Sequence, residues 1–175
     1  MDRPSARERF DELVWPHAAM VARTALILTH NQAEADDLAQ ETLIKAFKSL
    51  DRFREGTDMR SWLATILRNT RIDRIRAAGA RFTVPLEADV QDISEPAVDN
   101  SAAWSNPQAM LDGFSDEQMI RAMQSLPEEM RWALLLVDVE GLDQADAARI
   151  MGVPVGTVKS RIHRGRAMLR NALLA

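Results

Sequence analysis

Basic and hydroxyl side chains recur near the end of the chain, from about residue 155 to residue 174. Helical periodicity places the following side chains on an outward face: Thr157, Lys159, Ser160, His163, Arg164 and Arg166. Donors of this kind near the start of a helix suit base edges in the major groove and phosphate oxygens. The pattern therefore predicts a helix that binds nucleic acid; the alternative is a solvated basic face on an ordinary helical hairpin.

Small and apolar residues upstream predict how this helix is held. Ala148 lets two helices approach, Gly152 lies where the chain must turn, and Val158 fills the gap between the helices. This spacing is typical of a helix-turn-helix, which we expect over residues 143–163. The buried face of its second helix is predicted to hold Val158, Ile162, Gly165 and Leu169.

Acidic and amide side chains form a second group on a helix predicted from Ala33 to Leu50, which Asn31 would cap. The group consists of Asp36, Asp37, Gln40 and Glu41, beside Leu38 and Leu43. An apolar centre with a charged rim suits a basic partner helix, and the alternative is a solvated acidic face. Helical spacing predicts one buried face made of Ala35, Leu38, Ala39, Leu43, Ile44, Ala46, Phe47 and Leu50.

A third group combines a short polar loop, residues 53–58, with the helix that follows it. Gly56 allows a close backbone approach in the loop, and Asn69, Asp73 and Arg76 share one helix face at steps of four and three. Extruding a base from its stack costs a few kcal/mol, which polar contacts in a pocket must offset. The loop and the helix are candidates for such contacts.

Two residues of this third group leave alternatives open. Asp73 would repel phosphate, so it either accepts from a cytosine amino group or pairs with Arg74 or Arg76. Trp62 is either a stacking platform for bases or an anchor in the apolar run with Leu63.

The whole chain shows helical periodicity and no strand-like alternation, so we expect an all-α fold. Residues 6–29 predict one or two helices divided near Pro16. Near the C-terminus a helix over residues 126–140 is expected, with a capping box of Ser125 and Glu128, and shorter and longer helices follow at 143–151 and 155–174.

Prolines, acids and Asn/Ser clusters predict a linker between the two helical parts. The expected organisation is a domain over 1–79, an acidic linker over 80–115 and a domain over 116–175.

The net charge of −4 over 175 residues hides a strong segregation. Residues 60–81 hold six Arg against one Asp, net +5, and residues 147–175 hold six Lys or Arg and no acid, net +6. Between them, residues 82–129 hold ten acids against one Arg, net −9. A polyanion responds to the local field, so two basic blocks suit a nucleic-acid partner despite the negative total.

The composition also narrows the chemistry. Because the chain has no Cys, it can form neither disulfides nor thiolate metal sites. No nucleophile–base pair, phosphate-cradling glycine loop or metal cluster is evident, so we expect no enzyme activity, no cofactor and no metal. No apolar run approaches the roughly 20 residues that span a bilayer, and the N-terminus lacks a hydrophobic signal core, so we expect a cytoplasmic chain without membrane insertion.

The motifs together resemble the extracytoplasmic-function (ECF) sigma factors, the minimal two-domain sigma factors of bacteria. The C-terminal resemblance lies in LPEE at 126–129, EGL at 140–142 and GVPVGTVKSR at 152–161. The N-terminal resemblance lies in NQAEADDLAQE at 31–41, FREGT at 53–57, SWL at 61–63 and RNT at 68–70. The resemblance covers about residues 7–78 and 118–172, in the family's order.

The resemblance implies three sets of binding residues. Docking on the coiled-coil clamp of the polymerase core would use Asp36, Asp37, Leu38, Gln40, Glu41 and Thr42. The minus-ten promoter element would be held by Phe53, Arg54, Gly56, Thr57, Asn69, Asp73 and Arg76. The minus-thirty-five element would be held by Thr157, Lys159, Ser160, Arg161, His163, Arg164 and Arg166. His163 stands where the family often has an aromatic residue.

The implied partners are the clamp and flap regions of the large polymerase subunits, promoter DNA and an anti-sigma factor. The acidic linker would either thread the RNA-exit path of the polymerase or act as a soluble tether. Two rivals remain open. A sigma mimic that titrates an anti-sigma factor needs no basic helix, whereas this chain keeps one, and a plain helix-turn-helix regulator would leave the N-terminal half unexplained.

Overall fold

The computed structural model describes residues 5–54, 56–79 and 116–175 of the chain. The part described contains helices and connecting turns and no strand, which confirms the all-α expectation. The predicted linker over 80–115, with Pro85, Trp104 and Phe114, lies outside the described residues, and the exact domain bounds stay predictions.

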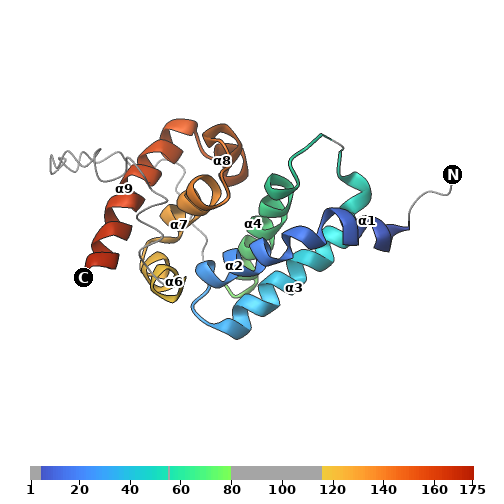
Figure 1. Ribbon diagram of the computed structural model, residues 1–175, viewed down its shortest axis with the longest axis horizontal. Helices are drawn as coiled ribbons and strands as arrows, with labels where there is room; N and C mark the ends of the chain where they lie inside the picture. The colour runs from blue at the N-terminus through green and yellow to red at the C-terminus, as the bar shows by residue number, and fades with distance from the viewer. Residues whose placement is uncertain (1–4, 55, 80–115) are drawn as a thin grey trace.

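The N-terminal domain is built from four α-helices and two short 3-10 turns (Figure 1). In chain order these are α1 (Ala6–Leu13), η1 (Trp15–His17), α2 (Ala18–Leu28), α3 (Gln32–Ser49), η2 (Leu50–Arg52) and α4 (Met59–Ala77). The 3-10 turn at Pro16 divides the first stretch, as predicted. Helices α2 and α4 both pack on α3, and the contact buries Leu28, Leu38, Leu63 and Leu67 completely.

The C-terminal domain contains four α-helices and one wide turn. They are α6 (Asp116–Gln124), α7 (Glu128–Leu134), the π-helical turn η4 (Leu135–Val139), α8 (Gln144–Met151) and α9 (Val155–Leu174). Helices α7 and α9 pack closely, because a Cβ on Gly165 would stand 3.2 Å from the Leu134 side chain. The predicted buried face of α9, with Val158, Ile162 and Leu169, is confirmed.

The helix caps agree with the sequence at some ends and differ at others. Asn31 caps α3 by accepting from the Glu34 backbone N–H at 2.7 Å, as predicted. The predicted capping box at Ser125 is wrong: Pro127 occupies the cap position, and the Ser125 hydroxyl donates to the Ala122 carbonyl. The Glu128 carboxylate instead accepts from Arg71 of the other domain, which is a stronger partner than an N-cap amide.

The long helix expected over 126–140 is also corrected. Its regular part ends at Leu134, and the chain continues as a π-helical turn in which the Glu140 N–H donates to the Leu135 carbonyl. Three successive leucines, Leu134 to Leu136, are buried there at 0–1% exposure, and no periodic pattern signals this wider turn.

The two domains pack against each other in this structure. Helices α6 and α7 contact α2, and α8 contacts α4. In Figure 1 the blue-to-green helices of the N-terminal domain and the yellow-to-red helices of the C-terminal domain stand side by side, with α2 and α4 at the boundary.

Candidate functional site

The helix-turn-helix in α8 and α9 has the predicted local geometry. Asp143 caps α8, and Gly152 ends it with a φ of 67°, a left-handed conformation that favours glycine. Ala148 and Val158 are both buried, at 5% and 0% exposure, and the Val153 N–H donates to the Ala148 carbonyl across the turn. Helix α9 is thereby fixed against α8 with one face toward solvent.

The outward face of α9 carries three exposed donors from the predicted set, which are Lys159, His163 and Arg164. Thr157 and Ser160 are half-buried, and the Ser160 hydroxyl donates to the Thr157 carbonyl at 3.0 Å. Arg161 is half-buried too, and burial lowers its pKa despite the opposing pull of the Glu129 carboxylate. The face can thus present two cations and an imidazole to a polyanion.

Arg166 differs from the prediction that it faces outward. Its guanidinium donates to both carboxylate oxygens of Asp138, at 2.6 and 2.9 Å. Its side chain is about one third exposed, and the hydrogen bonds to Asp138 raise its pKa. In this structure Arg166 therefore ties α9 to η4 instead of presenting a free cation.

Helix α3 presents an acidic and amide group, as predicted, through the exposed side chains of Asp36, Asp37 and Gln40. Leu38 and Thr42 of the predicted docking set are both 0% exposed, so in this structure neither side chain is presented at the surface of α3. The Thr42 hydroxyl donates to the Leu38 carbonyl one turn earlier, so this buried hydroxyl is satisfied on the inner side of α3.

Glu41, the remaining member of the predicted docking set, pairs with basic side chains of α4 and of α3 itself. Its carboxylate accepts from Arg74 at 2.7 Å and lies 3.1 Å from the Lys45 ammonium. The hydrogen bond from Arg74 is the main cause that lowers the Glu41 pKa, and Lys45 adds to it. Glu41 therefore joins α3 to α4.

An open apolar groove lies beside the acidic group, and sequence reasoning missed it. Trp15, Ile44 and Phe47 line the groove and are 61%, 48% and 45% exposed. Helical spacing predicted Ile44 and Phe47 on the buried face, and this prediction is wrong. The helices packed on α3 cover only part of its apolar stripe, so these two side chains stay exposed. Phe10 and Phe47 contact edge to face, with ring centroids 5.5 Å apart. The other lining residues are Asp36, Ala39, Gln40 and Leu43.

The loop before α4 is anchored by aromatic packing. The rings of Phe53 and Trp62 meet edge to face, with centroids 5.2 Å apart. Trp62 is half-buried in this contact, as expected of an anchor. Gly56 has a φ of 91°, and the Thr57 N–H donates to the Arg54 carbonyl, so a tight turn exposes the polar loop.

The predicted face of α4 is exposed at Asn69, Asp73 and Arg76. Asp73 pairs with neither of its expected arginines, because its carboxylate accepts from Lys45 of α3 at 3.4 Å. Lys45 also pairs with Glu41, so it offsets only part of the negative charge that Asp73 would present to phosphate. Among the residues described, no cluster of His, Asp or Glu could hold a metal ion, and no helix is long and apolar enough to cross a membrane.

Comparisons with known proteins agree with this arrangement. The family described as "Sigma-70 region 2" matches residues 13–81, and "Sigma-70, region 4" matches residues 116–169. The chain is 39% identical over 171 residues to "ECF RNA polymerase sigma factor SigE" of Mycolicibacterium smegmatis, covering 97% of this chain and 63% of that protein. It is 36% identical over 167 residues to "ECF RNA polymerase sigma factor SigM" of Mycobacterium tuberculosis, covering 95% and 78%.

Solved structures show the same fold. The sigma factor RpoE of Bartonella quintana, in complex with the anti-sigma factor NepR, matches with a TM-score of 0.70 at 26% identity, covering 95% of this chain and 97% of that chain. CnrH in complex with the cytosolic domain of CnrY matches with a TM-score of 0.62 at 25% identity, covering 95% and 88%. With both sigma-70 regions in order and relatives of this similarity, the chain belongs to the family of ECF RNA polymerase sigma factors.

Proposed function

We propose that this chain binds the core of bacterial RNA polymerase, confers promoter recognition and promotes strand opening. The observation that carries the proposal is the pairing, in one chain, of a cationic helix-turn-helix face with a separate apolar groove rimmed by acidic and amide groups. Sigma factors are transcription initiation factors and not enzymes in themselves, so the proposed role is binding and positioning.

Core docking is assigned to the groove of α3. Exposed Ile44 and Phe47 supply apolar area, while Asp36, Asp37 and Gln40 supply a polar rim that would complement a basic coiled coil. The C-terminal domain would contact the flap of the polymerase. This division leaves the exposed face of α4 at Asn69 and the outward face of α9 available to DNA.

Promoter reading is assigned to two faces. On α9, Lys159, His163 and Arg164 would contact bases or phosphates of the minus-thirty-five element. On the N-terminal domain, the exposed loop at Gly56 and the α4 face at Asn69 would hold bases of the minus-ten element after they leave the stack. The pairing of Asp73 with Lys45 supports a role for Asp73 in orienting the α4 face.

Control by an anti-sigma factor is part of the proposal. It is supported by the similar sigma factor RpoE, which was solved in complex with the anti-sigma factor NepR, and by the similar CnrH, which was solved with the cytosolic domain of CnrY. The sigma-mimic alternative is disfavoured because the exposed cations on α9 would serve no purpose in a decoy.

Run-off transcription with purified core polymerase and a library of promoter sequences tests the proposal. We expect transcripts that require this chain and share a sequence motif upstream of their start sites. Core polymerase alone is the control. Absence of any chain-dependent transcript, combined with tight binding to an anti-sigma factor, would establish the mimic instead.

Core docking is tested separately with Ile44→Glu, which places a charge in the groove, and with Ala172→Glu, an exposed control on α9. We expect Ile44→Glu to weaken core binding at least tenfold, about 1.4 kcal/mol, and Ala172→Glu to leave it unchanged. Equal binding by both variants would move the docking site away from the groove.

A further inference from the structure

One carboxylate lies in the most basic part of α4. Asp73 is the only acid between residues 60 and 81, which hold six Arg. It lies on the exposed face of the helix, one turn after Asn69 and one turn before Arg76. A carboxylate on a face that meets DNA repels phosphate, so its presence there favours a specific role for it. The side chains around Asp73 indicate which role it can have.

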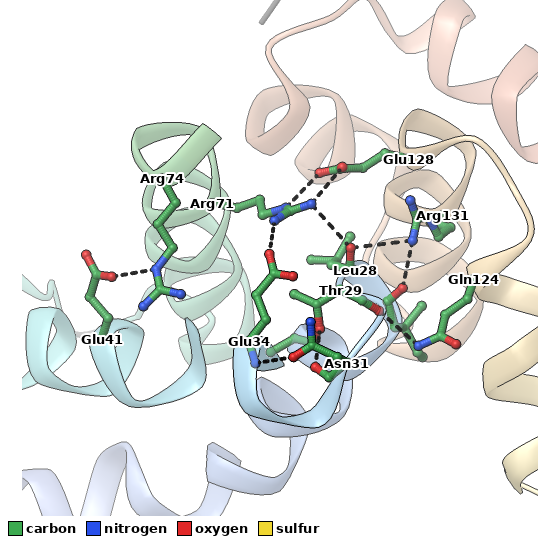
Figure 2. A network of polar contacts seen from close by, with 12 residues as sticks. Leu28, Thr29, Asn31, Glu34, Glu41, Arg71, Arg74, Gln124, Glu128 and Arg131 are labelled. Carbon is green, nitrogen blue, oxygen red and sulfur yellow. Dashed lines mark hydrogen bonds and ion pairs between the residues drawn. The ribbon is translucent and has the colours of Figure 1, made fainter. Parts of the chain in front are cut away.

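The arginine next to Asp73 in sequence does not neutralise it. Arg74 donates instead to Glu41 of α3 at 2.7 Å, as Figure 2 shows. The partner of Asp73 is Lys45 of α3, whose ammonium lies 3.4 Å from the Asp73 carboxylate and 3.1 Å from that of Glu41. The side chains of Asp73 and Lys45 are still 61% and 39% exposed. Both groups are therefore accessible to a ligand on this face.

The two side chains place an acceptor beside a donor. An ionised carboxylate only accepts hydrogen bonds, and it can take two in parallel from a planar partner. Lys45 contacts only Oδ2 of Asp73, from the edge of the face. Its ammonium has three N–H groups, of which the two carboxylates account for two. The pair can thus accept two hydrogen bonds from a flat ligand and donate one to it.

An unpaired base presents its Watson–Crick edge to such a pair. On this edge guanine has two adjacent donors, N1–H and the N2 amino group, and next to them the acceptor O6. Adenine and cytosine have a single donor, which is the N6 or the N4 amino group, and thymine has only N3–H. Guanine is therefore the one base that donates twice to a carboxylate while its oxygen accepts from a neighbouring ammonium.

We propose that Asp73 and Lys45 select guanine in the unpaired strand of the minus-ten element. Asp73 accepts from N1–H and from the N2 amino group, and Lys45 donates to O6. This proposal deepens the proposed function and rests on it for the nature of the ligand, a melted DNA strand. It replaces the cytosine contact considered for Asp73, which would use one amino group and leave one carboxylate oxygen without a donor. Lys45 is a specificity residue that helical periodicity does not reveal, because it lies on another helix, 28 positions from Asp73.

The base preference is tested by selection from a single-stranded DNA library of random sequence, with the full chain and no polymerase. We expect one position to be enriched in guanine about fivefold or more, the discrimination typical of a bidentate contact to a base. The same library in duplex form is the control for the edge that is read. Because pairing occupies the Watson–Crick edge, the duplex should show no preference that depends on Asp73.

Two variants of the reading pair and one control are compared in this selection. Asp73→Asn puts a donor and an acceptor in place of two acceptors, so the preference at this position should move from guanine to adenine or cytosine. Lys45→Met removes the donor to O6 and should lower the guanine enrichment at the same position. Asp11→Asn makes the same change in charge as Asp73→Asn at an exposed residue of α1, and it should keep the parent preference.

Base analogues in one selected oligonucleotide test the individual atoms. Inosine lacks the N2 amino group, and 7-deazaguanine lacks N7 on the opposite edge of the base. We expect inosine to weaken binding of the parent chain about threefold to tenfold, because one hydrogen bond to a carboxylate is lost. The same analogue should leave binding of Asp73→Asn nearly unchanged, and 7-deazaguanine should leave binding of the parent unchanged.

Several results would overturn the guanine contact. They are guanine enrichment at no position, the same base preference in Asp73→Asn as in the parent, or a loss with 7-deazaguanine as large as that with inosine. A cytosine preference that disappears in Asp73→Asn would establish the cytosine contact instead. All of these results come from the chain and an oligonucleotide alone, so they can be told apart from a failure of the run-off assay, which would refute the proposed function.

Discussion

The close approach of α7 and α9 can be tested at Gly165, which is buried on the inner face of α9. A Cβ built there stands 3.2 Å from two carbons of the Leu134 side chain and 3.4 Å from Cβ of Met130. The substitution Gly165→Ala therefore forces the two helices, or the Leu134 side chain, to shift by a few tenths of an ångström. Gly156 lies in the same helix, and a Cβ built there has no neighbour within 4 Å, so Gly156→Ala is a control without this clash.

The two substitutions share one gain and differ in one cost. Alanine is favoured over glycine within a helix by about 0.8–1 kcal/mol, which we expect to be somewhat smaller near the helix start at Gly156. Overpacking a closely packed interface costs about 1–3 kcal/mol. We therefore expect Gly156→Ala to raise the free energy of unfolding by about 0.5–1 kcal/mol. The free energy of unfolding of Gly165→Ala should be about 1–3 kcal/mol lower than that of Gly156→Ala.

Urea unfolding of the full chain, followed by circular dichroism, measures both variants. Hydrogen exchange on peptides from α7 and α9 assigns the change to this interface. In Gly165→Ala the exposed face of α9 should also shift against α8, so that DNA binding weakens while core binding persists. If Gly165→Ala were as stable as Gly156→Ala, Leu134 would yield without cost, and the packing argument would fail.

Three further predictions concern side chains on the described surfaces. Substituting Lys159 or Arg164 by Ala should weaken binding to a minus-thirty-five duplex by about 1–3 kcal/mol where the contact reads a base; an unchanged footprint on the selected promoter would remove that residue from the reading set. Asp138→Asn should destabilise the C-terminal domain by about 1–2 kcal/mol, because it removes the negative charge and one of the two oxygens that accept from Arg166. An unfolding midpoint equal to that of the parent would contradict this prediction. The pKa of Glu41 is lowered in the folded chain, so the stability that this carboxylate contributes is present above the unfolded pKa and is lost as the pH falls through the folded value. Glu41→Gln should therefore be less stable than the parent at pH 7 and as stable as the parent in acid. A stability difference that does not change with pH would refute the pairing with Arg74.

Local patterns were sufficient to predict the helix-turn-helix. Ala148, Gly152 and Val158 lie within one short stretch, and each one's role depends on neighbours close in sequence. The left-handed turn at Gly152 and the buried face of α9 followed from glycine's freedom and from helical periodicity alone. The same holds for the Asn31 cap, which needs only the amide three residues later.

The exposed set on α3 was predicted only in part. Periodicity shows which residues share a stripe, and it does not show how much of that stripe another helix covers. Leu38 and Ile44 belong to the same stripe, yet one is fully buried and the other is half exposed. Only the placement of α1, α2 and α4 around α3 decides which apolar residues are left for a partner.

Residue types and their spacing were enough to predict the all-α class, most of the helices, the family and the segregation of charge into two basic blocks. Which charged side chains have partners depends on how the helices pack. Asp73 pairs with Lys45 and Arg166 pairs with Asp138, and both pairs join residues 28 positions apart. The domain boundary joins Arg71 to Glu128 over 57 positions. These ion-pair partners come from different helices that pack together in space. Helical periodicity relates only residues close in sequence, so it cannot predict such pairs.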